Sequence, residues 1–130
     1  MTEDTAGLLA LALGLFVIAG TVHSVRNTAR DGGLARNAFL GLRTSATLAS
    51  DRAWSEGHLA AVPRLTAAMR CGYATGAVAL GFLLSALAAE ALLPLAWAAA
   101  VLGYAASMAL LVAATVRSHT VAKRVLEETR

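Results

Sequence analysis

Residues 6–25 read AGLLALALGLFVIAGTVHSV and contain no Asp, Glu, Lys or Arg. Two further uncharged stretches follow, CGYATGAVALGFLLSALAA at 71–89 and LLPLAWAAAVLGYAASMALLVAATV at 92–116. Each has about the 20 apolar residues that an α-helix needs to cross a hydrocarbon core of about 30 Å. A surface helix of a water-soluble protein would instead show a polar stripe along one side. The sequence therefore predicts an all-α integral membrane protein with three transmembrane helices.

The composition of the chain agrees with a bilayer environment. Hydrophobic residues make up 58% of the sequence and charged residues 15%, against roughly 25% charged in ordinary globular domains. Cys71 is the only cysteine, so neither an intramolecular disulfide nor a thiolate metal site is predicted. Acidic Glu3 and Asp4 precede the first apolar stretch, which we therefore expect to be a retained helix and not a signal peptide. No cofactor and no metal ion is predicted.

The basic residues are distributed unevenly along the chain. All eleven Lys and Arg residues lie in the connection 26–70 or in the tail 117–130. Because basic residues resist translocation and stay in the cytoplasm, we expect a single membrane domain, residues 1–130, in a bacterial inner membrane, with the N-terminus outside and the C-terminus in the cytoplasm. Orientation accounts for the net charge of +3. The lipid bilayer is the expected partner, and direct binding of nucleic acid is not expected.

Small residues recur at four-residue spacing within the apolar stretches. Gly72 and Gly76 form one such step, and Gly103 and Ser107 form another. Small side chains let helix backbones approach closely, which is how packing is gained in lipid. These residues are predicted to lie at helix contacts, either within the chain or in a homo-oligomer. Since the stretches carry no Asp, Glu, Lys or Arg, ion transport is not expected.

The connection 26–70 is too long to be a simple link between neighbouring helices. Ser50 and Asp51 are typical of a helix start. One face of the following segment is largely apolar and carries Trp54, His58, Ala61 and Leu65. Arg52 and Glu56 fall on the opposite face, so the pattern predicts a short amphipathic helix in the membrane interface. Pro63 is expected to bend or break this helix before the second span. The tail is expected to continue the third helix, with Val121, Val125 and Leu126 on one face.

A spaced motif in the connection resembles the signature of a known family. The residues follow N-x3-G-x-R-T-x2-T-x2-S-x3-W-x3-H, with matches at Asn37, Gly41, Arg43, Thr44, Thr47, Ser50, Trp54 and His58. This pattern, followed by a transmembrane segment, resembles the SdpI/YhfL family of small bacterial membrane proteins. Many relatives have Pro after the Arg-Thr pair, where this chain has Ser45. The resemblance implies immunity to a secreted membrane-active peptide, or signalling through a bound peptide or cytoplasmic regulator. It covers the C-terminal half of the larger immunity protein that gives the family its name.

The motif residues also have a chemistry of their own. Arg43 offers five donors in a planar fork, and the hydroxyls of Thr44, Thr47 and Ser50 precede a helix N-terminus, where anions bind. A lipid phosphate, a peptide carboxylate or the backbone of the loop itself could accept these donors. In the structural alternative, Arg43 ties the loop to helix ends and the hydroxyls act as caps. Trp54 and His58 are either part of a ligand site or an interfacial anchor with a hydrogen-bonded packing residue.

Three functions remain open from the sequence. The first is a non-enzymatic binding protein that engages a peptide toxin or a cytoplasmic regulator. The second is an accessory subunit of a larger membrane complex or homo-oligomer. The third is a membrane enzyme that acts on a peptide or lipid with Glu56 and His58. Those two residues lie two positions apart and point to different faces of a helix, and no catalytic residue is assigned.

Overall fold

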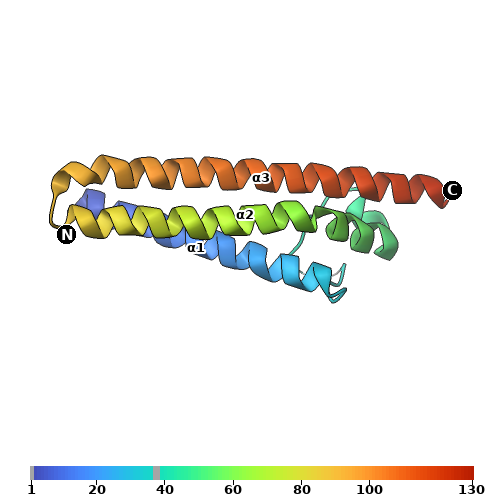
Figure 1. The fold of residues 1–130 in the computed structure, drawn as a ribbon. Coiled ribbons are helices and arrows are strands. Elements are labelled where there is room, and N and C mark those ends of the chain that lie inside the picture. Colours follow the sequence, from blue (N-terminus) through green and yellow to red (C-terminus); the bar gives the residue numbers. More distant parts are fainter. Residues whose placement is uncertain (1, 37–38) are drawn as a thin grey trace. The chain divides into compact units, whose positions relative to one another are not determined.

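A computed structural model describes residues 2–36 and 39–130. These residues contain three long helices, α1 (Glu3–Arg30), α2 (Asp51–Ala86) and α3 (Leu93–Glu128), and short 3-10 turns at η1 (Thr47–Ala49) and η2 (Glu90–Leu92) (Figure 1). Each of the three helical segments is long and apolar enough to cross a membrane. For the described residues, the predicted all-helical architecture with three membrane-length helices is confirmed.

The ends of α1 follow from local sequence. Glu3 and Asp4 lie in its first turn and Arg30 in its last, charges that complement the helix dipole. After the helix, the amide of Gly33 donates to the carbonyl of Thr28 at 3.0 Å, and the amide of Gly32 donates to that of Ala29 at 3.3 Å. With Gly32 at a φ of 73°, this is a Schellman termination, which satisfies the last carbonyls of the helix.

The start of α2 is as predicted, but its course is not. The amide of Ala53 donates to the Ser50 hydroxyl at 3.1 Å, so Ser50 caps the helix that begins at Asp51. Pro63 lies inside α2, which continues through it to Ala86, so the alternative of a break is wrong, and the alternative of a bend stays a prediction. Proline removes one hydrogen bond of a helix, while paired alanines at 60–61 and 67–68 favour helix on both sides. The predicted short helix and second span are therefore parts of one helix, and the interfacial location of the former stays a prediction.

The start of α3 and the course of the tail agree with the sequence. Pro94 lies in the first turn of the helix, where its missing amide hydrogen costs nothing. The helix continues without interruption to Glu128. The prediction that the tail extends the third helix is therefore confirmed.

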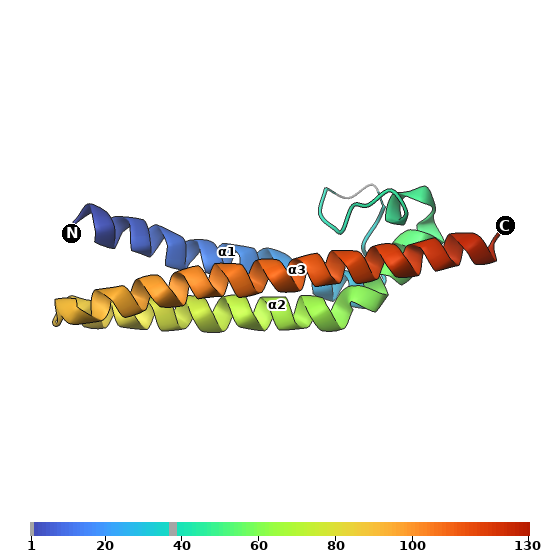
Figure 2. The same ribbon diagram turned by 90° about the horizontal axis from the view of Figure 1, so that it is seen from above.

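The chain forms two compact units. The first consists of Met1–Thr21 and Ala68–Met108, and the second of Val22–Ala67 and Ala109–Arg130. In the first unit, segments of the three helices (Figures 1 and 2) pack around a core of small and aliphatic side chains. This core consists of Leu8, Ala12, Ala79, Leu83, Ala96 and Ala100. The expectation of a single membrane domain stays a prediction.

Three of the four predicted packing residues lie at helix contacts within the first unit. A Cβ atom on Gly72 would lie 3.0 Å from the Ala19 Cβ, and one on Gly76 would lie 3.2 Å from the Phe16 ring. A Cβ on Gly103 would overlap the side chain of Thr75. Ser107 is buried. The three glycines lie where helices of one chain meet, while a helix contact at Ser107 and a part in self-association stay predictions.

One polar contact in the first unit is not evident from the sequence. The Tyr104 hydroxyl donates to the Leu11 carbonyl at 3.0 Å. A Cβ atom on Gly14 would overlap that hydroxyl. Gly14 therefore leaves the space in α1 that the tyrosine of α3 occupies.

The second unit contains the connection between α1 and α2. A small core joins Ala46, Ala53, Ala122 and Val125. Figure 2 shows the connection folded back beside the C-terminal part of α3, without projecting past the end of that helix. The predicted face of α2 is buried, with exposed fractions of 2% or less at Trp54, His58, Ala61 and Leu65. Protein atoms cover this face. Its apolar residues therefore pack against other parts of the same chain.

Candidate functional site

Three residues of the motif meet where the connection crosses α2. Gly41 has a φ of 137°, a conformation that side chains disfavour. A Cβ atom there would lie 2.7 Å from Trp54 Cη2 and 3.0 Å from His58 Nε2. The loop can therefore touch the two rings only because residue 41 is glycine. Asn37, the first residue of the motif, lies outside the described residues.

Hydrogen bonds to both ring nitrogens fix the state of His58. Nδ1 lies 2.8 Å from the Trp54 carbonyl oxygen, and Nε2 lies 2.7 Å from the Leu42 amide nitrogen. The carbonyl can only accept and the amide can only donate. His58 is therefore the neutral tautomer with its hydrogen on Nδ1, and Nε2 accepts from Leu42. This contact holds the connection against α2.

Trp54 makes the second contact between α2 and the connection. Its indole Nε1 donates to the Leu34 carbonyl at 2.8 Å, which satisfies the polar atom of a buried ring. The Trp54 and His58 ring centroids are 4.1 Å apart at an interplanar angle of 40°. Leu34 precedes the tip of the connection and Leu42 follows it, so the two rings hold both sides of the loop.

Thr44 and Thr47 close the loop just before α2. The Thr44 amide donates to the Thr47 hydroxyl at 2.9 Å, and the Thr47 amide donates to the Thr44 hydroxyl at 3.2 Å. The Thr47 hydroxyl lies 2.8 Å from the Leu42 carbonyl oxygen, and Thr47 is fully buried. With Ser50 capping α2, all three motif hydroxyls bond to the backbone of the chain itself.

Arg36 is part of the site although the sequence did not single it out. Its guanidinium donates to the Leu48 carbonyl at 2.9 Å and pairs with the Asp51 carboxylate at 2.9 Å. A pocket of about 390 Å³ beside Trp54 is lined in part by Arg36, Asp51 and Ser55. The predicted anion donor Arg43 is exposed in the same loop, and its binding role stays a prediction.

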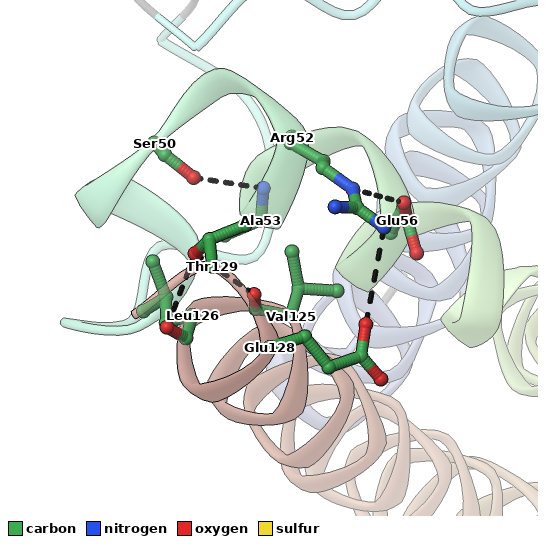
Figure 3. A network of polar contacts seen from close by, with 8 residues as sticks. All are labelled: Ser50, Arg52, Ala53, Glu56, Val125, Leu126, Glu128 and Thr129. Atoms are coloured by element: carbon green, nitrogen blue, oxygen red, sulfur yellow. Dashed lines mark hydrogen bonds and ion pairs between the residues drawn. The ribbon is translucent and has the colours of Figure 1, made fainter.

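The C-terminal part of α3 packs against this site. Gly57 faces Ser118, and a Cβ atom on Gly57 would lie 2.9 Å from the Ser118 carbonyl oxygen. Figure 3 shows Arg52 of α2 paired with Glu56 at 2.8 Å and with Glu128 of α3 at 3.9 Å. Val125, beside this pair in Figure 3, is buried in the core of the second unit. The tail is thus a packing element of the site.

Gly57 provides a test of this close approach. Replacing Gly57 by alanine is expected to destabilise the second unit by about 1–3 kcal/mol, because the new methyl group overpacks a backbone contact. Replacing Gly81 of the same helix is the matched control, since nothing lies within 4 Å of its Cβ position. There alanine should be neutral or stabilising by up to about 1 kcal/mol. Thermal unfolding in detergent measures both, and equal midpoints would contradict the contact.

The state of His58 predicts a dependence on pH. His58 precedes the uncharged stretch 71–89. Burial lowers its pKa below the ordinary value of 6.5, and the Trp54 carbonyl opposes this with a smaller effect. A histidine with a lowered folded-state pKa contributes stability that is present above the unfolded pKa and lost as pH falls below it. Protonation also turns Nε2 into a donor that faces the Leu42 amide.

We therefore expect the second unit to lose stability as pH falls from about 6.5 toward 5. Hydrogen exchange at the Leu42 amide across this range measures the loss. The His58→Gln variant lacks the titrating group and should show a much weaker dependence. The same pH dependence in both proteins would assign the effect to another group.

The contacts of Glu56 and His58 do not favour the enzyme alternative. Both nitrogens of His58 are bonded to backbone groups, while Glu56 accepts from Arg52 at 2.8 Å. Neither ring nitrogen is left to move a proton to a substrate. Within the part of the chain that the structure describes, no three His, Cys, Asp or Glu residues gather as a metal site would require.

The fold and site define a class but not a family. The chain is an all-helical protein whose three long helical segments have membrane-spanning length and composition across the described residues. No family model matches its sequence, and neither a curated protein nor a solved structure was found to be similar.

Proposed function

We propose that the chain is a bacterial inner-membrane protein with its N-terminus outside and the connection and tail in the cytoplasm. We further propose that the connection is a prefolded binding module with a role in peptide immunity or signalling, as in the SdpI/YhfL family. The basic residues of the connection and tail support the orientation, since such residues remain on the cytoplasmic side.

The packing of the loop against α2 carries the proposal: Gly41 lies against Trp54 and His58, and Leu42 is bonded to both His58 and Thr47. The four motif positions among these are spread over 18 residues of sequence and were selected by their resemblance to a family motif. A loop already held in shape loses less entropy when it binds a partner.

The chemistry of the loop favours a partner with carboxylates. The connection 26–70 carries seven arginines against three acidic residues, a balance that attracts an acidic peptide or protein surface. The pocket beside Trp54 is lined in part by Arg36 and Ser55, and also by Asp51, whose carboxylate pairs with Arg36 at 2.9 Å. Its volume of about 390 Å³ lies within the usual range of ligand sites. A peptide C-terminus or an acidic loop of a regulator fits this description.

A survival assay tests the immunity role. A toxin-sensitive strain expressing the chain is exposed to culture supernatant from the organism that encodes it. We expect increased survival with the wild type and with Gly81→Ala, whose site faces open space. Trp54→Ala, which removes the ring that holds the loop, should lose the protection. If survival does not rise while the protein is present in the membrane, the immunity role is wrong.

A further inference from the structure

The tip of the connection presents two apolar side chains that the chain itself does not cover. Phe39 is 95% exposed and Leu40 is 41% exposed. The other exposed large hydrophobic residues of the described chain lie in the long helices or in the turn after α2. Lipid would cover the residues of the spans, but Phe39, like Leu59 of α2, lies in the polar, arginine-rich connection 26–70. Its exposure therefore calls for a different explanation.

The base of this tip is fixed on both sides. Before it, Arg36 is held by the Leu48 carbonyl and by Asp51, each at 2.9 Å. After it, the Leu42 amide is held by His58 at 2.7 Å. The residues at positions 36 and 42, on either side of the apolar pair, are therefore held by the folded chain. Exposing an aromatic ring to water is unfavourable, so an apolar environment next to the loop would stabilise this arrangement.

The charges around the tip indicate which environment this is. Arg36 and Arg43 flank the apolar pair in sequence, and the connection as a whole carries excess positive charge. Aromatic side chains beside basic residues are typical of segments that lie at a membrane surface. Anionic lipids of the cytoplasmic leaflet attract such segments electrostatically.

The size of the tip argues against a protein partner at this position. A stable protein interface buries about 1,200–2,000 Å² in total, and an aromatic side chain accounts for about 150–250 Å². Two side chains are too few for such an interface, but they suffice to enter the headgroup region. We propose that Phe39 and Leu40 insert into the cytoplasmic leaflet, with the neighbouring arginines next to anionic lipid headgroups. This inference rests on the proposed membrane insertion, but not on the immunity or signalling role.

Fluorescence quenching in reconstituted vesicles tests the proposal. The full chain with Cys71→Ser receives one cysteine, Phe39→Cys, which is labelled with an environment-sensitive fluorophore. The probes are vesicles of phosphatidylcholine alone and of phosphatidylcholine with an equal part of phosphatidylglycerol. Nitroxide-labelled lipid reports contact with the bilayer, and acrylamide, which is uncharged, reports contact with water. Ser45→Cys is the matched control, since Ser45 is exposed in the same connection.

We expect the label at position 39 to be quenched by the nitroxide lipid and to be several-fold less accessible to acrylamide than the label at 45. The protection should be stronger in vesicles that contain phosphatidylglycerol. Equal acrylamide access at positions 39 and 45 overturns the proposal. Protection from acrylamide without quenching by the nitroxide lipid also overturns it, because protein and not lipid would then cover the tip. Equal protection in the two vesicle types overturns the role of the arginines.

A third label separates this inference from the proposal on which it rests. Val17 is 68% exposed in the first apolar stretch, so a label at Val17→Cys should be quenched by lipid whenever the chain is inserted. Lipid quenching at 17 without quenching at 39 refutes the inference alone. Access of acrylamide to position 17 refutes membrane insertion and the inference together.

Discussion

Replacing Gly41 by alanine is expected to release the connection from α2. The residue has a φ of 137°, which costs alanine about 1–3 kcal/mol. The added methyl group would also lie 2.7 Å from the Trp54 ring, and overpacking of this kind costs about 1–3 kcal/mol. Together these effects amount to roughly 2–6 kcal/mol, enough to open the contact between the Leu42 amide and His58.

Hydrogen exchange at the Leu42 and Thr44 amides measures this opening directly. The matched control is Gly32→Ala, because Gly32 also has a positive φ of 73° but nothing lies within 4 Å of its Cβ position. The control should therefore show only the cost of the left-handed backbone, about 1–2 kcal/mol. If the two variants exchange alike at residues 42 and 44, the close approach at Gly41 does not hold the loop.

Replacing Trp54 by alanine is expected to destabilise the second unit by about 3–5 kcal/mol, the usual cost of emptying a large buried site. The ring is 2% exposed, contacts His58, and donates to the Leu34 carbonyl at 2.8 Å. Trp54→Phe keeps much of the ring but leaves that carbonyl without its donor. We expect a smaller loss for this variant, about 1–3 kcal/mol.

Thermal unfolding in detergent should place Trp54→Phe between the wild type and Trp54→Ala. Leu59→Ala is the control, since Leu59 lies on the same helix but is 53% exposed. Its unfolding temperature should stay near that of the wild type. An equal shift for Leu59→Ala and Trp54→Ala would mean that the indole ring does not hold the connection.

The helices could be predicted from the sequence because charge and proline mark their limits. A bilayer excludes charged side chains over about 30 Å, so the three uncharged stretches indicate their number and approximate place. Ser50 and Pro94 add local signals for two helix starts. Pro63 did not end the helix, which continues on both sides of it, so of the two expected effects only a bend is left as a prediction. Proline is a strong local breaker, but helix-favouring neighbours can outweigh it.

The face of α2 could be predicted, but not what covers it. The helical spacing of Trp54 and His58 indicates that their face is buried, but it does not show whether lipid or protein covers it. In the structure, protein atoms cover both side chains. Gly57 was a missed signal, because a glycine inside a helix is costly and usually has a packing reason. Arg36 gave no signal, since its partners Leu48 and Asp51 are brought to it only by the folded loop.

Thiol labelling of intact cells tests most directly the claim that the folded connection faces the cytoplasm. In a Cys71→Ser background, single cysteines replace Thr2, Ser45 or Glu127, all exposed positions. A membrane-impermeant maleimide should label Thr2→Cys in intact cells. Ser45→Cys and Glu127→Cys should react only after the cells are opened. Labelling of Ser45→Cys in intact cells, with Thr2→Cys protected, would contradict the orientation and the cytoplasmic binding role that depends on it.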